Sequence, residues 1–149
     1  MEKMNATERI SVMSYKDTKN ISDSDLRPLY ESVGWVSYTE KFTDLSVLIA
    51  NSYQVISAWD GIVLTGLIRT VGDGLSIQYV QDLLVLPKYQ NCGIGTELMK
   101  RIMDTSTHIR QFVLITDGQE ENKAAVEFYM KMGLKTFEET KTCGLQAKT

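Results

Sequence analysis

The sequence predicts an α/β fold in which a mixed, mostly antiparallel sheet carries helices on both faces. Two segments with helical spacing come first, three segments rich in β-branched and aromatic residues follow, and strand and helix patterns then alternate. With 149 residues, 43% of them hydrophobic, the chain has the length of one domain with its own core. We therefore expect a single domain over residues 1–149.

Two helices are predicted after a short strand at residues 9–15. The first begins with a capping-box-like pair, Ser22 and Asp25, and ends near Gly34. Its apolar residues recur at i, i+3, i+4 and i+7, namely Leu26, Leu29, Tyr30 and Val33. The second segment places its apolar residues on one side, namely Phe42, Leu45, Leu48 and Ile49. Each helix should therefore pack one face against the core.

Three strands are predicted next, at residues 53–59, 61–71 and 75–86. The first two are separated by Asp60-Gly61 and the last two by Gly72-Asp73-Gly74, and both stretches are typical of hairpin turns. An antiparallel meander is the natural arrangement of these strands.

The last third of the chain alternates helix and strand. A helix follows a glycine-rich loop and turns four apolar residues inward, namely Leu98, Met99, Ile102 and Met103. A buried strand at residues 111–116 and a helix at residues 121–133, stopped by Gly133, come next. The tail from Leu134 is expected to form one or two weaker strands.

Composition excludes several classes of protein. The net charge is −3 and no cluster of Lys and Arg could follow a phosphate backbone, so nucleic acid is not an expected partner. No apolar run is long enough to span a bilayer and no secretory signal is present, which indicates a cytoplasmic protein without a membrane partner. Two cysteines, Cys92 and Cys143, and one histidine, His108, suggest free thiols and no bound metal.

The glycine-rich loop "QNCGIGTEL", residues 90–98, lies between an apolar strand and a helix. Backbone amides at such a place bind anions. A Walker loop is absent from the sequence. A dinucleotide-binding loop is disfavoured, because Leu98 stands where its third glycine belongs and only 32 residues follow Asp117.

The residues around this loop resemble a known family. The stretch "LLVLPKYQNCGIGTELM" resembles the acyl-CoA-binding signature of the GNAT superfamily of N-acetyltransferases, through Gln90, Gly93 and Gly95. Downstream, "ENKAAVEFYMKMGLK" resembles the second motif of that superfamily, with Asn122 and Tyr129 seven residues apart. The resemblance implies a GNAT-like fold with the cofactor in a cleft between the two central strands, and acetyl-CoA as the acetyl donor.

The resemblance also implies cofactor-binding residues. The backbone of Leu83, Leu84 and Val85 would pair with the pantetheine amides, although an ordinary buried strand would show the same side chains. The CoA pyrophosphate would meet the loop, where glycine permits a close backbone approach. The expected contacts in the loop are Gln90, Asn91, Cys92, Gly93, Ile94, Gly95 and Thr96, and those in the second motif are Asn122 and Tyr129.

Acetyl transfer to an amine needs a proton acceptor, because an ammonium group with a lysine-like pKa of about 10.4 has no lone pair at neutral pH. Asp117 and Asp82 are the candidate bases, and each could instead be a cap or a surface group. The resemblance makes Tyr129 the candidate acid that protonates the leaving thiolate. A tyrosine buried in the core is the alternative interpretation of that residue.

The acceptor pocket of this superfamily lies largely between the segment that joins the first two helices and the central strands. Trp35, Tyr38, Tyr79 and Gln81 are its candidate residues, and core packing explains Trp35 and Tyr38 equally well. The expected reaction is acetyl transfer to a primary amine, favouring a small cationic amine. Acetylation of a protein amine and a non-catalytic acyl-CoA-binding or sensing module are the alternatives. The protein is expected to be a monomer or a homodimer.

Overall fold

The computed structural model describes residues 5, 12–116 and 122–147. These residues fall into two compact units, one that ends at Ile115 and one that begins at Thr116. Each unit is described by itself.

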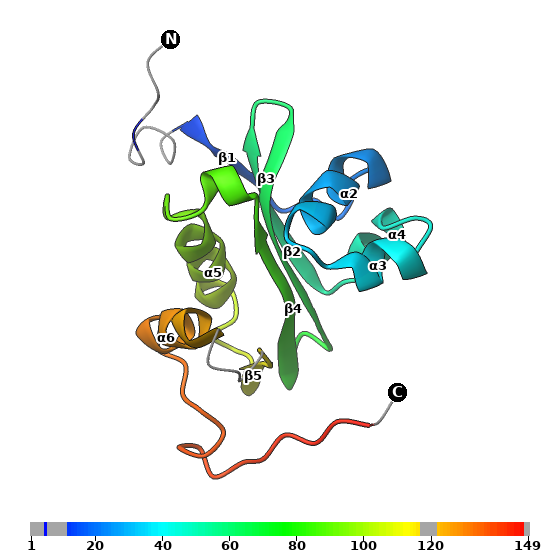
Figure 1. Cartoon of the computed structure of the whole chain (residues 1–149). Coiled ribbons are helices and arrows are strands. Elements are labelled where there is room, and N and C mark those ends of the chain that lie inside the picture. Colours follow the sequence, from blue (N-terminus) through cyan, green and yellow to red (C-terminus); the bar gives the residue numbers. More distant parts are fainter. Residues whose placement is uncertain (1–4, 6–11, 117–121, 148–149) are drawn as a thin grey trace. The chain divides into compact units, whose positions relative to one another are not determined.

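The first unit is built on a five-stranded sheet with the order β1-β2-β3-β4-β5 (Figure 1). The first four strands are antiparallel, and β5 is parallel to β4 because a helix carries the chain back before β5 begins. The sheet is therefore mixed, as predicted, and the meander is confirmed. Its strands are β1 (Ser14–Lys16), β2 (Gln54–Asp60), β3 (Val63–Gly72), β4 (Ile77–Val85) and β5 (Gln111–Leu114).

Helices cover both faces of this sheet (Figure 1). One face carries α2 (Asp23–Ser32), α3 (Val36–Lys41) and α4 (Ser46–Ala50), and the other carries α5 (Ile94–Asp104). Helix α2 begins as predicted, since the Ser22 side chain accepts the Asp25 N–H at 3.2 Å.

The second predicted helix is divided into α3 and α4, which differs from the expectation of one continuous segment. Phe42 has extended backbone angles, φ −110° and ψ 122°. The Asp44 carboxylate then accepts the backbone N–H of Ser46 at 3.0 Å and its hydroxyl at 2.6 Å. Such a local side-chain bond offers the backbone an alternative to the helical ladder, so the helix stops and restarts.

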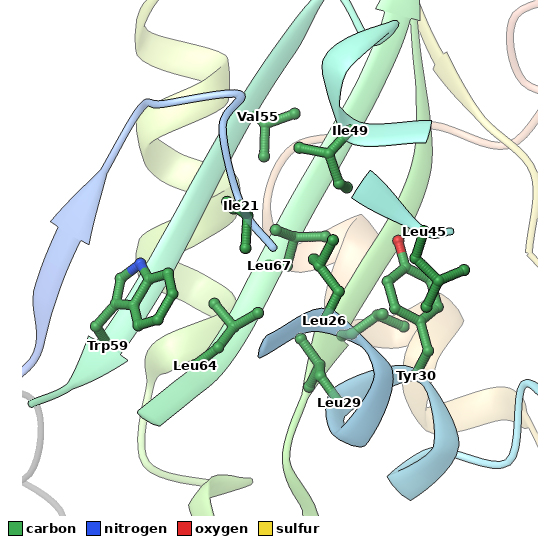
Figure 2. Packing of buried hydrophobic residues seen from close by; sticks show 11 residues of the cluster. Ile21, Leu26, Leu29, Tyr30, Leu45, Ile49, Val55, Trp59, Leu64 and Leu67 are labelled. Carbon is green, nitrogen blue, oxygen red and sulfur yellow. The ribbon is translucent and has the colours of Figure 1, made fainter. Parts of the chain in front are cut away.

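The core between this helical layer and the sheet is aliphatic with two large aromatic side chains (Figure 2). Leu26, Leu29 and Tyr30 reach it from α2 and are fully buried, as the i, i+3, i+4 spacing predicts. The other buried members are Ile21, Leu45, Ile49, Val55, Trp59, Leu64, Leu67 and Leu84.

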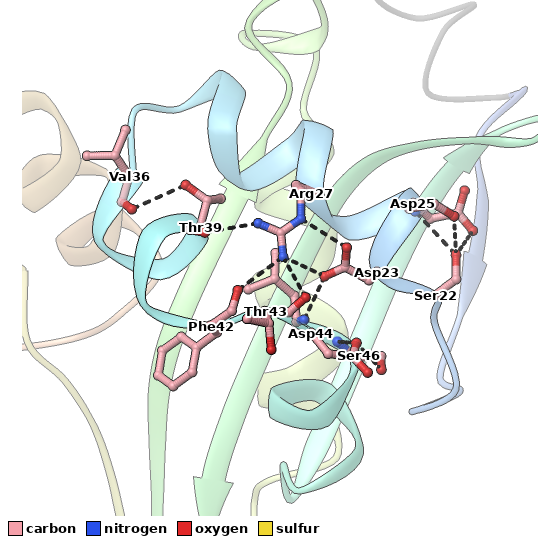
Figure 3. Close-up of polar contacts among 12 residues, drawn as sticks. Ser22, Asp23, Asp25, Arg27, Val36, Thr39, Phe42, Thr43, Asp44 and Ser46 are labelled. Atoms are coloured by element: carbon pink, nitrogen blue, oxygen red, sulfur yellow. Dashed lines mark hydrogen bonds and ion pairs between the residues drawn. The ribbon is translucent and has the colours of Figure 1, made fainter.

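Arg27 ties α3 to α2 (Figure 3). Its guanidinium forms an ion pair with Asp23 at 2.8 Å and donates to three backbone carbonyls at the end of α3 and just after it, those of Thr39, Phe42 and Thr43. The last carbonyls of a helix have no partner within it, so Arg27 satisfies groups that would otherwise need water. The hydrogen bond from Arg27, followed by one from the Leu45 N–H, lowers the pKa of Asp23. Helix α3 is thereby held in place, and with it the residues that it carries.

On the opposite face, α5 packs directly on the backbone of the sheet. Leu98, Met99 and Ile102 are buried as predicted, and Met103 is only partly buried. Gly66 of β3 permits this approach, because a Cβ there would lie 3.0 Å from Ile94 Cγ2 and 3.2 Å from the Leu84 carbonyl oxygen. A side chain at this position would therefore crowd α5 and the neighbouring strand, and glycine avoids that contact.

The second unit contains α6 (Lys123–Lys131), whose chain leaves the helix through Gly133 at φ +98°. The prediction of strands after Leu134 is wrong for the described residues 134–147, which form turns and irregular chain. In one turn the Thr142 N–H donates to the Phe137 carbonyl at 2.8 Å. The Thr136 hydroxyl accepts the Glu139 N–H at 3.2 Å, and such a local side-chain bond gives the backbone an alternative to a strand ladder. In the ranges that the structure describes, every helix is too short or too polar to cross a membrane.

Candidate active site

Strand β4 loses its neighbour halfway along. The parallel pairing with β5 runs from Ile77 opposite Gln111 to Val80 opposite Leu114 and then stops. From Gln81 to Val85, β4 is paired only with β3, as far as the described residues show. Unpaired strand edges present a row of free N–H and C=O groups. Within the sheet, residues Gln81–Val85 therefore form an open edge, which we call the β4 edge.

The direction of the backbone groups on this edge follows from one hydrogen bond. The Leu86 N–H donates to the Thr65 carbonyl at 2.8 Å and so faces β3. Because backbone groups alternate in direction along a strand, those of Leu84 also face β3, while those of Leu83 and Val85 face the open side. Of the three residues expected to pair with a cofactor, the structure thus brings Leu83 and Val85 to the edge, and Leu84 contributes to the core instead.

A β-bulge lies at the start of the β4 edge. Arg69 is opposite Asp82 and Thr70 is opposite Val80, so Gln81 has no partner on β3. An extra residue reverses the alternation of side chains along the strand. Asp82 accordingly points to the face that α2 and α3 cover, where it accepts a hydrogen bond from Tyr30.

Asp82 is the centre of a buried polar group that we call the Asp82 cluster, consisting of Tyr30, Tyr38, Arg69 and Asp82. The Arg69 Nε lies 2.6 Å from Asp82 Oδ2, and the two side chains are 8% and 0% exposed. Tyr30 donates to Oδ2 at 2.7 Å and Tyr38 donates to Oδ1 at 3.0 Å. Burial, and then the negative charge of Asp82, raise the pKa of both tyrosines. Both phenols are therefore proton donors at neutral pH, and the charge of Asp82 is balanced by Arg69.

Three of the four predicted acceptor residues meet at this cluster. Gln81 Nε2 donates to the Tyr38 hydroxyl at 3.1 Å, and the Trp35 ring stacks on Tyr38 with centroids 5.9 Å apart and planes at 20°. Trp35 and Tyr38 are partly buried and Gln81 is exposed. The fourth, Tyr79, lies in the paired part of β4, opposite Val71 on β3 and Val113 on β5.

The Tyr30 and Arg69 contacts to Asp82 were not foreseen from the sequence, which identified Tyr30 only as a core residue. A signal for Arg69 existed: it stands inside the apolar strand pattern "GLIRTV", and a charged residue is seldom fully buried unless it is paired.

The glycine-rich loop leads from the end of β4 into α5. Asn91 and Gly93 both have left-handed backbone angles, φ +61° and φ +86°, which explains the glycine at position 93. Helix α5 has no side-chain cap among the described residues, and its first internal bond joins the Glu97 N–H to the Gly93 carbonyl at 3.0 Å. Amide groups before Glu97 therefore have no partner within the helix, and together with the helix dipole they can bind an anion.

Gly95 differs from Gly66 in what surrounds it. A Cβ at Gly95 would contact only Val85 Cγ2, at 3.9 Å, which is ordinary van der Waals distance. Packing within the protein therefore does not require glycine at position 95. A side chain at position 95 would instead occupy the space beside Val85, at the end of the β4 edge.

Side chains fasten the loop on both sides. The Tyr89 hydroxyl donates to Asp60 Oδ2 at 2.6 Å, and Gln90 Nε2 donates to the Val85 carbonyl at 3.0 Å. The Cys92 side chain is turned inward, with 6% of the residue exposed, and its thiol donates to the Gln90 carbonyl. Both cysteines are free thiols, as expected. Asn91 and Thr96 are exposed on the surface of the loop.

The remaining predicted residues belong to the second unit or lie outside the described residues. Asn122 precedes α6 and its side-chain amide donates to Thr116 Oγ1 at 2.9 Å. Tyr129 is partly buried on α6, edge-on to Phe128 with centroids 5.2 Å apart, and burial raises its pKa. Asp117 falls outside the described residues.

An open strand edge followed by a helix N-terminus without a side-chain cap can accommodate an extended ligand that ends in an anion. Residues 48–136 match the family described as "Acetyltransferase (GNAT) domain". The chain belongs to this family of acetyltransferases.

Individual relatives agree with this. A GNAT-family acetyltransferase from Streptococcus pneumoniae superposes with a TM-score of 0.78 and 34% identity, over 92% of this chain and 98% of that one. An acetyltransferase from Streptococcus agalactiae shares the fold with a TM-score of 0.62 and 22% identity, over 82% of each chain. The uncharacterised N-acetyltransferase ycf52 of Porphyra purpurea is 26% identical over 121 residues, which are 78% of this chain and 67% of that protein. The GNAT-like fold predicted from the two motifs is therefore confirmed.

Proposed function

We propose that this protein transfers an acetyl group from acetyl-CoA to a primary amine. The β4 edge carries this proposal, because the backbone N–H and C=O of Leu83 and the N–H of Val85 face its open side and it leads into the loop before α5, while the Val85 carbonyl already accepts from Gln90. An extended pantetheine arm, with two amides, can add to such an edge as a further strand does. The pyrophosphate then meets the amide groups at the start of α5.

The same geometry supports a position for the acetyl group. Val85 lies four positions after Gln81, which is about 13 Å of extended strand at roughly 3.3 Å per residue. A cofactor that follows the edge away from the loop therefore brings its thioester to the bulge, where the pairing of β4 with β5 begins. Tyr38, Gln81 and the Asp82 cluster are the groups at that end.

The reaction joins the amine nitrogen to the acetyl carbon and breaks the carbon–sulfur bond of the thioester. A backbone N–H on the β4 edge stabilises the oxyanion that forms in between. The CoA thiolate takes a proton, and Tyr129 is the proposed donor, on the strength of its place in the second motif. Asp82 already accepts three hydrogen bonds and balances Arg69, so we assign it the positioning of Tyr38. Asp117 or a water molecule is the proposed base.

The proposed acceptor is a small primary amine. The stacked rings of Trp35 and Tyr38 offer π faces to a cation, which contribute about 0.5–2 kcal/mol. Asp82 adds no net charge to the pocket, because Arg69 lies 2.6 Å away. The amine should therefore bind about 2- to 30-fold more tightly than the neutral alcohol with the same skeleton, the affinity equivalent of that cation–π energy.

The test is thiol release. The protein is mixed with acetyl-CoA and each member of a panel of small primary amines, and free CoA thiol is followed by absorbance while the acetylated amine is identified by mass spectrometry. We expect thiol release that depends on the amine. The mass of the amine should increase by about 42 Da, because acetylation adds a C₂H₂O group. Saturable binding of acetyl-CoA without any release would identify a non-catalytic binding module instead.

Gly95→Ala should separate stability from cofactor binding. Alanine favours a helix by about 0.5–1 kcal/mol over glycine, and none of the described residues clashes with the added methyl group, so Tm should rise by about 1–4 °C. The methyl group would stand in the path of the cofactor, and overpacking of this kind costs about 1–3 kcal/mol, or roughly 5- to 150-fold in Kd. Thermal unfolding with and without acetyl-CoA measures both effects, since a bound ligand raises Tm.

Gly66→Ala is the matched control. Its Cβ would come 3.0 Å from Ile94 Cγ2, so we expect Tm to fall while the additional rise caused by acetyl-CoA persists. A Gly95→Ala protein that binds acetyl-CoA as tightly as the parent would show that the cofactor does not approach α5 at this point.

A further inference from the structure

We propose that the side-chain carbonyl of Gln81 receives the acceptor amine, and that the Asp82 cluster determines its orientation. This inference rests on the proposed function, because it names the residue that selects the acceptor of that reaction. It goes further in assigning a single atom, Gln81 Oε1, and in explaining why that atom and not the amide nitrogen faces the ligand.

The orientation follows from counting donors and acceptors. An ionised carboxylate only accepts hydrogen bonds, so the single proton of the Tyr38 hydroxyl goes to Asp82 Oδ1, 3.0 Å away. The Tyr38 oxygen is then left with acceptor capacity only. Gln81 contacts that oxygen at 3.1 Å and must therefore present its NH₂ group to it. Arg69 Nη2, a donor at 3.4 Å, points to the same oxygen and is consistent with this assignment.

The carbonyl of the same amide consequently faces away from Tyr38. Among the described residues Gln81 Oε1 has no hydrogen-bond partner, and the side chain is exposed. Reversing the amide would place the Gln81 carbonyl oxygen against the Tyr38 oxygen, and both are acceptors. The buried ion pair of Arg69 and Asp82 therefore determines, through two hydrogen bonds, which way the exposed Gln81 amide is turned. Arg69, Asp82, Tyr38 and Gln81 thus form one directional chain that ends in a free acceptor.

The position of this acceptor matches the chemistry of the substrate. Gln81 is the bulge residue and the first residue of β4 beyond the pairing with β5, which is where the thioester is proposed to lie. A primary amine or ammonium group donates hydrogen bonds and fits a carbonyl oxygen. The acetylated product has lost the charge of the ammonium form and two of its three N–H groups, so the same oxygen binds it less well. Gln81 therefore favours substrate over product.

The experiment compares Gln81→Met with the parent, using the amine of the panel with the highest kcat/KM. Methionine keeps the length of the side chain and removes both polar groups. A hydrogen bond to a charged group corresponds to about 10- to 150-fold in affinity, so we expect KM for the amine to rise by about that factor. KM for acetyl-CoA should stay within about twofold, and Tm should hardly change at an exposed position. Gln111→Met, at an exposed glutamine in the paired part of β5, is the control and should leave both KM values unchanged.

Tyr38→Phe provides the second arm. It removes the hydroxyl that orients Gln81, so it should also raise KM for the amine. In the Gln81→Met background it should add little, because the group on which it acts is already gone, and two independent structural effects would add instead. The inference is overturned if the effects of the two substitutions on the amine KM are fully additive, or if Gln81→Met leaves that KM unchanged. In either case, thiol release by the parent would still support the proposed function. A parent that releases no thiol with any amine overturns both.

Discussion

Replacing Tyr129 by phenylalanine should lower kcat by about 10²- to 10⁴-fold, the range that a general acid contributes. Phenylalanine keeps the ring that packs against Phe128 and removes only the hydroxyl. The Kd for acetyl-CoA should change far less. Turnover at saturating acetyl-CoA and equilibrium binding of the cofactor measure the two quantities separately.

The pH dependence gives an independent check on this role. Burial raises the pKa of Tyr129 above its ordinary value of 10.0, so the phenol carries its proton throughout the neutral and mildly alkaline range. An amine with a pKa of about 10.4 becomes a better nucleophile as pH rises, so kcat/KM should increase with pH in the parent and fall only once Tyr129 deprotonates. In Tyr129→Phe, kcat/KM should be lower throughout and should no longer fall at alkaline pH.

Tyr53→Phe is a suitable control, since Tyr53 is also partly buried and belongs to no part of the proposed site. Its kcat should match that of the parent. A loss of less than about fivefold in Tyr129→Phe would return Tyr129 to a packing role, because general acids contribute far more than this.

Replacing Asp82 by asparagine should lower the free energy of unfolding by about 3–5 kcal/mol, because it leaves Arg69 as a buried charge without a counter-ion. For a chain of this length that corresponds to a fall in Tm of roughly 6–20 °C. Urea unfolding at pH 7 measures the change. Glu97→Gln is the comparison, since Glu97 and Arg101 form an exposed ion pair at 2.8 Å that should contribute at most about 1 kcal/mol.

A second variant separates charge from shape. Combining Asp82→Asn with Arg69→Gln removes both charges and keeps neutral groups that can hydrogen-bond, so much of the lost stability should return. A loss below about 1 kcal/mol in the single variant, the level of an exposed pair, would mean that water reaches the Arg69 side chain.

Several features of this protein could be predicted from short stretches of sequence. The start of α2 at Ser22, the buried positions of α2 and α5, and the hairpins that connect β2, β3 and β4 depend on residues within a few positions of one another. Capping, helical spacing and turn chemistry are local interactions, and a local pattern records them. The two motifs also sufficed for the family, because their residue types and spacing are specific to it.

Other local predictions failed where a competing interaction was not considered. The hydrogen bonds from Ser46 to Asp44 divide one expected helix into α3 and α4, and residues 134–147 form turns where strands were expected. In both cases a side chain nearby in sequence bonds to the backbone, Asp44 to Ser46 and Thr136 to Glu139, and such local bonds compete with helices and strand ladders.

The sequence by itself determined most of the elements, their order and the glycine-rich loop that we propose binds the cofactor. Only the tertiary structure decided what the candidate residues can do. The sequence made Asp82 a candidate base. In the structure the bulge at Gln81 turns its side chain toward Arg69, which lies opposite on β3 and 13 positions earlier in the chain. Gly66 and Gly95 are alike in the sequence, yet among the described residues a side chain would be crowded at Gly66 and have room at Gly95. Charge pairing, free strand edges and space around a Cβ depend on which distant segments come together, and one-dimensional spacing does not carry that information.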